Sequence, residues 1–287
     1  MFIVSLGLAA GCSGRYERSN YYERSTWTTD GNIVCIRGIS QTEYNSLNTR
    51  VGESYNEYIS VVTNDGTIET AYNNVTEYLA ADLTYNPTSE IIAFRTGSSS
   101  GISRYIIMQY LPSASYTGPD SITLSVPNVL SFDWDNTGTK IVYCNTDGEI
   151  RLINIDGSGD ALIKDAGAKT VNWKYGNRIA FEYLDSGETK LALINSDGTG
   201  QINMLLNSVT DPQISRVNSN HIYGKRDYGY IKLDVTNYPT IESTTLIASL
   251  ESSNPRLSPD ATMITVCTDD GLYTILLSDG TETKIKP

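Results

Sequence analysis

The stretch Trp134-Asp135-Asn136-Thr137-Gly138-Thr139-Lys140-Ile141-Val142 decides the fold, because each of its parts recurs along the chain. A large residue is followed by a turn rich in Asn, Asp and Gly. A short apolar strand that begins with Ile comes next. Asn, Asp and Gly adopt the backbone angles that a tight hairpin requires. The stretch is therefore typical of two antiparallel strands joined by a short turn.

The strand that begins with Ile occurs six times, at intervals of 59, 49, 38, 43 and 42 residues. Its copies begin at Ile33, Ile92, Ile141, Ile179, Ile222 and Ile264. A period of about 40–50 residues is typical of β-propeller blades, each of which is a four-stranded sheet. The sequence therefore predicts an all-β fold, a six-bladed β-propeller with four-stranded antiparallel blades. The predicted blades span residues 25–70, 83–120, 129–165, 171–208, 213–248 and 255–287.

Two further features recur with the blades. A second strand often ends in Asp-Gly, a strong hairpin signal, at Asp65-Gly66, Asp156-Gly157, Asp197-Gly198 and Asp279-Gly280. A large residue precedes most of the turns, and we expect these residues to pack between neighbouring blades: Trp27, Tyr85, Trp134, Trp173 and Leu257. The last blade has its own outer strand, Thr281–Ile285, so we expect the ring to close by side-chain packing.

Two of these repeats resemble those of a known family. Trp134–Val142 and Ser258–Ile264 resemble the Trp-Ser-Pro-Asp-Gly repeat of TolB-like, WD-repeat-like propellers, and Ile194–Gly200 is similar to its closing Asp-Gly motif. The resemblance covers residues 25 to 287. It implies a six-bladed propeller without the N-terminal α/β domain of TolB, and it specifies no chemistry.

The N-terminal sequence predicts export to the cell envelope. Residues 1–11 are apolar or small and suit the apolar region of a signal peptide, although a disordered apolar tail is the alternative. Leu8–Cys12 resembles the bacterial lipobox, which implies acylation of Cys12. We therefore expect a bacterial lipoprotein that contacts a membrane only through its lipid, on the periplasmic or cell-surface side. Residues 12–24 are predicted to form a polar tether.

The inventory of reactive groups favours a protein that is not an enzyme. His221 is the only histidine, so a His-based metal cluster is excluded, and neither a nucleophile elbow nor a phosphate-binding loop occurs. We expect no metal and no cofactor. The net charge of −12 disfavours nucleic acid as a partner. Beyond Cys12, the three remaining cysteines are expected to be small buried hydrophobic residues.

The long connections are the predicted binding sites. An insertion at Arg37–Glu57 and a connection at 111–128 carry the candidate binding residues Tyr44, Arg50, Tyr55 and Tyr116. Tyr and Arg are common anchors of protein interfaces, and a solvated insertion is the alternative. We therefore predict a monomeric, non-catalytic scaffold that binds an envelope protein through its propeller loops. A carbohydrate-binding or polysaccharide-lyase propeller remains the second hypothesis.

Overall fold

The computed structural model describes residues 15–28, 31–44, 50–63, 67–73, 81–89, 91–95, 106–110, 121–124, 126, 128–173, 176–207, 209–218, 220–227, 229–250, 255–268 and 271–286. The predicted signal-peptide region, Cys12 and Tyr116 lie outside these residues. All regular secondary structure in the described ranges is β-strand. The described part contains no helix that is long and apolar enough to cross a membrane.

The strands pair into six antiparallel, four-stranded sheets. The first three contain β1 (Arg15–Trp27), β2 (Ile33–Tyr44), β3 (Arg50–Val62) and β4 (Ile68–Asn73); β5 (Ala81–Tyr85), β6 (Ile91–Arg95), β7 (Ile106–Tyr110) and β8 (Ser121–Leu124); and β9 (Val129–Trp134), β10 (Lys140–Asn145), β11 (Glu149–Asn154) and β12 (Ala161–Asp165). The last three contain β13 (Ala168–Asn172), β14 (Arg178–Asp185), β15 (Glu188–Asn195) and β16 (Ile202–Asn207); β17 (Val209–Ile214), β18 (His221–Arg226), β19 (Gly229–Asp234) and β20 (Glu242–Ile247); and β21 (Arg256–Leu257), β22 (Met263–Thr268), β23 (Gly271–Leu276) and β24 (Glu282–Lys286).

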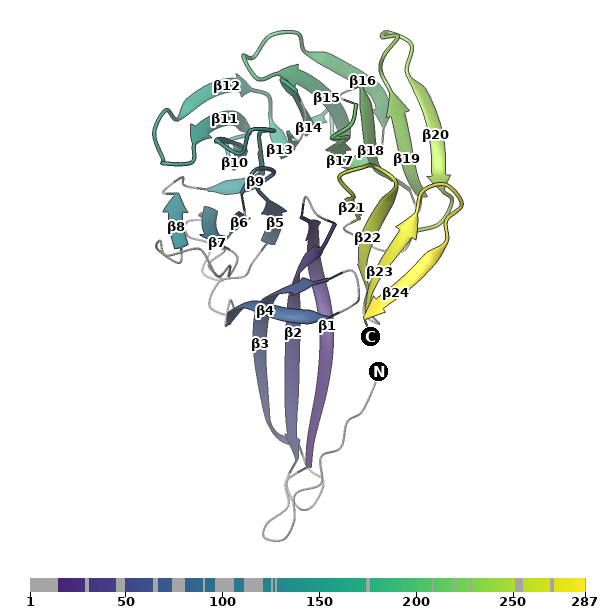
Figure 1. Cartoon of the computed structure of the whole chain (residues 1–287). Coiled ribbons are helices and arrows are strands. Elements are labelled where there is room, and N and C mark those ends of the chain that lie inside the picture. The colour runs from purple at the N-terminus through teal and green to yellow at the C-terminus, as the bar shows by residue number, and fades with distance from the viewer. Residues whose placement is uncertain are drawn as a thin grey trace.

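The sheets follow one another around a common centre in chain order, so the fold is a β-propeller (Figure 1). The first strand of each sheet is innermost: β1 contacts both β5 and β21, while β9 and β13 contact each other. The predicted fold class is therefore confirmed as an all-β propeller.

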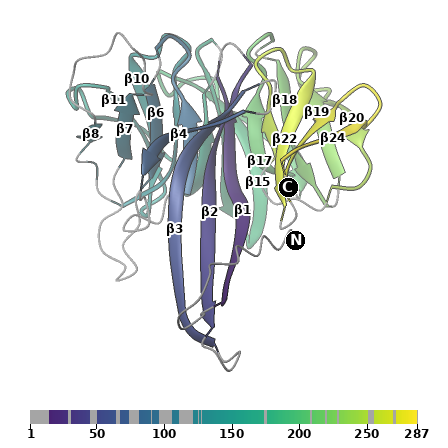
Figure 2. The same ribbon diagram turned by 60° about the horizontal axis from the view of Figure 1, so that its bottom comes forward.

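The predicted count of six blades is wrong, because the structure has five blades, although its strands pair into six four-stranded sheets. The first sheet departs most from the others. Its strands β1, β2 and β3 have 13, 12 and 13 residues, whereas no strand of the other sheets exceeds the eight residues of β14 and β15. The extra length carries these three strands out of the ring as a ribbon (Figure 2).

The inner half of the first sheet is packed on both faces. Val34 and Ile36 join an apolar cluster with Phe94 of the second sheet. Ile33 and Cys35 join another cluster with Leu272 of the last sheet. Alternate residues of β2 thus face opposite neighbours, which is why the start of this strand is apolar without a break. The first sheet therefore lies between the last and the second sheets.

The ring closes without exchange of strands. The last sheet contains only β21 to β24, so all of its strands come from the C-terminal part of the chain, as predicted. Two side-chain hydrogen bonds join it to β1. Trp27 Nε1 donates to the carbonyl oxygen of Arg256 over 3.0 Å, and the hydroxyl oxygens of Ser25 and Thr265 lie 2.8 Å apart.

The burial of the repeated large residues agrees with the prediction. All five are at least 92% buried: Trp27, Tyr85, Trp134, Trp173 and Leu257. Cys35 and Cys144 are buried, Cys267 is half-buried, and none of the three is in a disulfide. The tether predicted for residues 12–24 needs correction, because Arg15–Arg24 belong to β1. Pairing with β2 holds these residues in a strand although their composition is polar.

Candidate functional site

A polar residue occupies the same place in the innermost strand of every sheet. It stands directly before the large residue that ends the strand or, in the fifth sheet, before Ile214. These residues form what we call the polar belt: Thr26, Thr84, Asp133, Asn172, Gln213 and Arg256. Sequence reasoning missed the belt, although a polar residue before each of the aligned large residues was a usable signal.

Asp133 is the most strongly bonded member of the belt. Its Oδ1 accepts hydrogen bonds from Thr84 Oγ1 and from the backbone N–H of Trp134, both over 3.0 Å. Its Oδ2 accepts from Asn172 Nδ2 over 2.8 Å and from the N–H of Trp173 over 3.0 Å. The carboxylate is only 2% exposed, yet these donors use about all four of its acceptor sites. Asp133 thus joins the second, third and fourth sheets.

Asn172 and Gln213 repeat the same bond in the next two sheets. Asn172 Oδ1 accepts from the N–H of Ile214 over 2.7 Å. Gln213 Oε1 accepts from the N–H of Leu257 over 2.7 Å, while its Nε2 donates to the carbonyl oxygen of Pro255 over 2.6 Å. The inward edge of an innermost strand has no strand partner, so its buried N–H groups need other acceptors. The belt supplies them from the preceding sheet, and its role is therefore structural.

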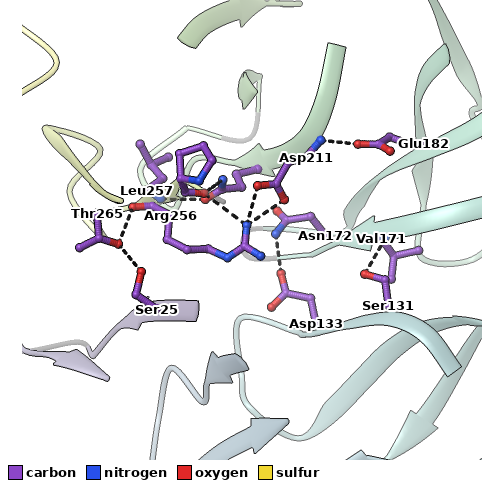
Figure 3. A network of polar contacts seen from close by, with 12 residues as sticks. Ser25, Ser131, Asp133, Val171, Asn172, Glu182, Asp211, Arg256, Leu257 and Thr265 are labelled. Carbon is purple, nitrogen blue, oxygen red and sulfur yellow. Dashed lines mark hydrogen bonds and ion pairs between the residues drawn. The ribbon is translucent and has the colours of Figure 1, made fainter. Parts of the chain in front are cut away.

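A chain of charged groups begins at the belt residue Arg256 and continues through Asp211 to Glu182 (Figure 3). Arg256 Nη1 is 2.8 Å from both carboxylate oxygens of Asp211. The backbone N–H of Asp211 donates to Glu182 Oε1. Burial raises the pKa of the Glu182 carboxyl to about 7, and the nearby negative charge of Asp211 adds to this increase. The fourth, fifth and last sheets are thus joined through the carboxyl groups of Glu182 and Asp211.

The structure places three of the four predicted binding residues in one extended part of the first sheet, and the fourth, Tyr116, lies outside the described residues. We define the ribbon as residues 15–22 of β1, 37–44 of β2 and 50–57 of β3. Tyr44 and Arg50 are register partners at its far end, and Tyr55 pairs with Ser40. The predicted insertion loop is therefore wrong, because most of Arg37–Glu57 forms paired strands.

Both edges of the ribbon lack a strand partner in the described sheet. β1 pairs only with β2, and β4 pairs with β3 only along Tyr58–Val62, which lies outside the ribbon. At the base of the ribbon, the Arg37 guanidinium lies 5.8 Å from the centre of the Tyr58 ring, a cation–π contact. The unpaired edges are backbone hydrogen-bonding surfaces that another chain can use.

His221 has a structural environment. Its Nε2 lies 3.1 Å from Asp234 Oδ2 and 3.3 Å from Asn218 Nδ2, on a half-buried part of β18. Within the described residues, no group of three or more His, Cys, Asp and Glu side chains is arranged to hold a metal ion.

Comparisons with known proteins connect the fold to several propellers. No family model matches the chain, and no curated protein matches it. A chain in the nidogen–laminin complex superposes with a TM-score of 0.62 and 11% identity, over 93% of this chain and 92% of that one. TolB from Acinetobacter baumannii gives 0.61 and 10%, over 93% and 78%. A structure assigned to TolB from Agrobacterium tumefaciens gives 0.56 and 15%, over 88% and 96%. At these identities the likeness establishes the propeller fold alone.

Substitution of Asn172 by Leu tests the belt. The change leaves the N–H of Ile214 without its acceptor and removes one donor from Asp133. We expect the free energy of unfolding to fall by about 2–4 kcal/mol, measured by urea denaturation with tryptophan fluorescence. The control is Asn203→Leu on β16, where the side chain is exposed, with an expected change below about 0.5 kcal/mol. Equal losses in both variants would contradict a structural belt.

Glu182→Gln tests the charged chain through pH. Folded Glu182 holds its proton up to about pH 7, while the unfolded chain releases it near the ordinary value of 4.5. The native state therefore binds more protons in this window, and stability falls as the pH rises from 4.5 to 7. Gln keeps the oxygen that accepts from Asp211 and does not ionise. We expect the variant to match the parent at pH 4.5 and to exceed its unfolding free energy by about 3 kcal/mol at pH 8. Parallel pH profiles of the two proteins would refute this assignment, and exposed Glu188→Gln is the control.

Proposed function

We propose that the chain is a non-catalytic, protein-binding propeller of the bacterial cell envelope, and that the ribbon is its main contact with the partner. The observation that carries this proposal is the pair of unpaired ribbon edges. The ring satisfies its own inner edges through the belt and buries its own apolar clusters. The ribbon projects beyond that self-contained ring (Figure 2).

The composition of the ribbon supports a protein partner. Most residues of the ribbon are polar, and small sheets of this kind are only marginally stable alone in water. A partner strand at an open edge adds backbone hydrogen bonds, and Tyr44, Arg50 and Tyr55 add side chains of the types that anchor interfaces. The nidogen–laminin neighbour is itself a component of a protein complex.

Two finer points belong to this proposal. The inner half of the β1–β4 sheet is the base of the ribbon, since it is packed between the second and the last sheets. The protein works as a monomer without a cofactor. The carbohydrate-binding alternative has no described residue cluster in its favour, and it becomes an outcome of the test below.

Removal of the ribbon tests the function. Arg37 and Tyr58 are register partners, so a two-residue Asp-Gly loop can replace residues 38–57 between them. Residues 15–21 are exchanged for a Gly/Ser segment of equal length. We expect the thermal unfolding of the ring to persist, because the belt and the apolar clusters are untouched. Capture of the envelope protein that the parent enriches, quantified by mass spectrometry, should weaken at least tenfold, or about 1.4 kcal/mol.

A matched pair of triple variants refines this test. One changes Tyr44, Arg50 and Tyr55 to Ala, and its control changes the ribbon residues Ser40, Thr42 and Ser54 to Ala. The first should lose most of the capture and the control should keep it. Undiminished capture by the ribbon-deleted protein would exclude the ribbon as the site. Depolymerisation or specific retention of a purified polysaccharide by the parent would favour the carbohydrate alternative.

We also propose that the protein is held at a membrane through a lipid on Cys12. The small residues that precede this cysteine carry the proposal. The variant Cys12→Ala should move from the membrane fraction to the soluble periplasmic or extracellular fraction. Unchanged fractionation would show that the lipid is not the attachment.

A further inference from the structure

The first strand of the ribbon has one open edge over its whole length. Among the described strands, β1 pairs with β2 alone, and the pairing runs from Arg15 to Tyr22 without a break in register. A register shift follows between Tyr22 and Ser25, so a β-bulge separates this edge from the part of β1 that lies in the ring. Figure 2 shows β1 along one side of the ribbon. The edge from Arg15 to Tyr22 is therefore accessible to another chain.

The hydrogen bonds at the turn between β1 and β2 show how the backbone of β1 is oriented. The N–H of Thr28 donates to the carbonyl oxygen of Asn32 over 2.9 Å. In an antiparallel pair, residues that bond to the partner strand alternate with residues that point away from it. The N–H of Trp27 therefore points away from β2. The N–H groups of Trp173 and Leu257 have the same orientation, since they donate to the preceding sheet.

This alternation extends into the ribbon along β2. The register between β2 and β3 is unbroken from Ile33 to Glu43, so successive residues of β2 bond alternately to β1 and to β3. Ile33 is the partner of Trp27 and points to β3, as do the other odd-numbered residues of β2. The β1 residues opposite these positions turn their N–H and C=O groups to the open edge. They are Tyr16, Arg18, Asn20 and Tyr22.

The other edge of the ribbon is less suited to an added strand. β4 already lies along β3 and ends at Asn73, the register partner of Tyr58 at the base of the ribbon. The chain leaves β4 at this point, next to the open edge of β3. Gly52 lies in the same edge, and glycine weakens a strand. Residues 15–22 contain no glycine, and they also contain no proline or lysine, the residues that commonly protect edge strands from pairing.

We propose that an extended segment of the protein partner adds to the β1 edge as a fourth strand of the ribbon. Its backbone bonds to the outward N–H and C=O groups of β1, and this type of pairing recognises an extended peptide chain. A segment of about seven residues, or about 20 Å, covers the edge from Tyr16 to Tyr22. The proposal rests on the protein-binding function proposed above, and it names the kind of chain that the ribbon binds.

The first test uses a peptide as the added strand. Acetyl-Arg-Gly-Ile-Ser-Gln-Thr-Glu-Tyr-amide copies residues 37–44 of β2, the strand that already pairs with β1. A control peptide has proline in place of the residues copied from Ser40 and Gln41, which prevents pairing along either of its edges. In the full chain labelled with ¹⁵N, the first peptide should shift the amide signals of Tyr16, Arg18 and Asn20 and slow their exchange with solvent. The control peptide should do neither.

A pair of variants isolates the backbone group. Asn20→Pro removes an outward N–H together with the side chain, whereas Asn20→Ala removes only the side chain. Proline is tolerated at an edge position whose N–H faces solvent, so both variants should keep the melting temperature of the ring. The affinity for the peptide should be at least tenfold lower in Asn20→Pro than in Asn20→Ala. The capture of the envelope protein that the parent enriches should differ in the same way.

The outcomes separate this proposal from the proposed function. If removal of the ribbon abolishes capture but Asn20→Pro and Asn20→Ala capture equally, strand addition is overturned and the proposed function stands. Undiminished capture without the ribbon overturns both. Shifts confined to β3, or no shift at about 5 mM peptide, also overturn strand addition at β1, since that concentration detects millimolar dissociation constants. A dimer of the parent that Asn20→Pro abolishes would make a second copy the occupant and would overturn the proposal as well.

Discussion

The ring depends on one recurring hydrogen bond, in which a side chain of one innermost strand accepts from the backbone N–H of the next. A propeller arranges its sheets so that each inner strand has one edge without a strand partner. At Trp173, Ile214 and Leu257 the acceptor is a carboxylate or amide of the preceding sheet. The same bonds fix the spacing between sheets, since each acceptor must reach the following strand. The hydrogen bonds that satisfy the backbone N–H groups of the inner edge are therefore the same bonds that hold neighbouring sheets together.

The charged chain of Arg256, Asp211 and Glu182 lies where the belt residue is a cation and not a hydrogen-bond acceptor. Arg256 occupies a belt position but has no acceptor on its side chain, so the bond to the first sheet is reversed and Trp27 donates to the Arg256 carbonyl. The guanidinium turns instead to Asp211. The junction where the N-terminal and C-terminal sheets meet thus differs from the three junctions that have the recurring bond.

The sequence predicts the ring well because its signals are local. An Ile strand, a turn and a large residue lie within about ten positions of one another, and all six copies fall in paired strands. The count of five blades was not predictable, because the long strands β1 to β3 pair through a polar composition that reads as an insertion within a sixth blade. The belt was missed because a single polar residue before Trp134 has meaning only once the repeats are aligned.

The ribbon also determines how the molecule stands relative to whatever precedes it in the chain. Arg15, the first residue of β1, is the register partner of Tyr44 at the far end of the ribbon. An attachment just before Arg15 would hold the tip of the ribbon, and the eight residues of β1 in it would raise the ring by about 26 Å. A lipid on Cys12 would then make the ribbon a spacer. The ribbon edges would then be accessible to proteins close to the bilayer surface. The ring would contact proteins about 26 Å above that surface.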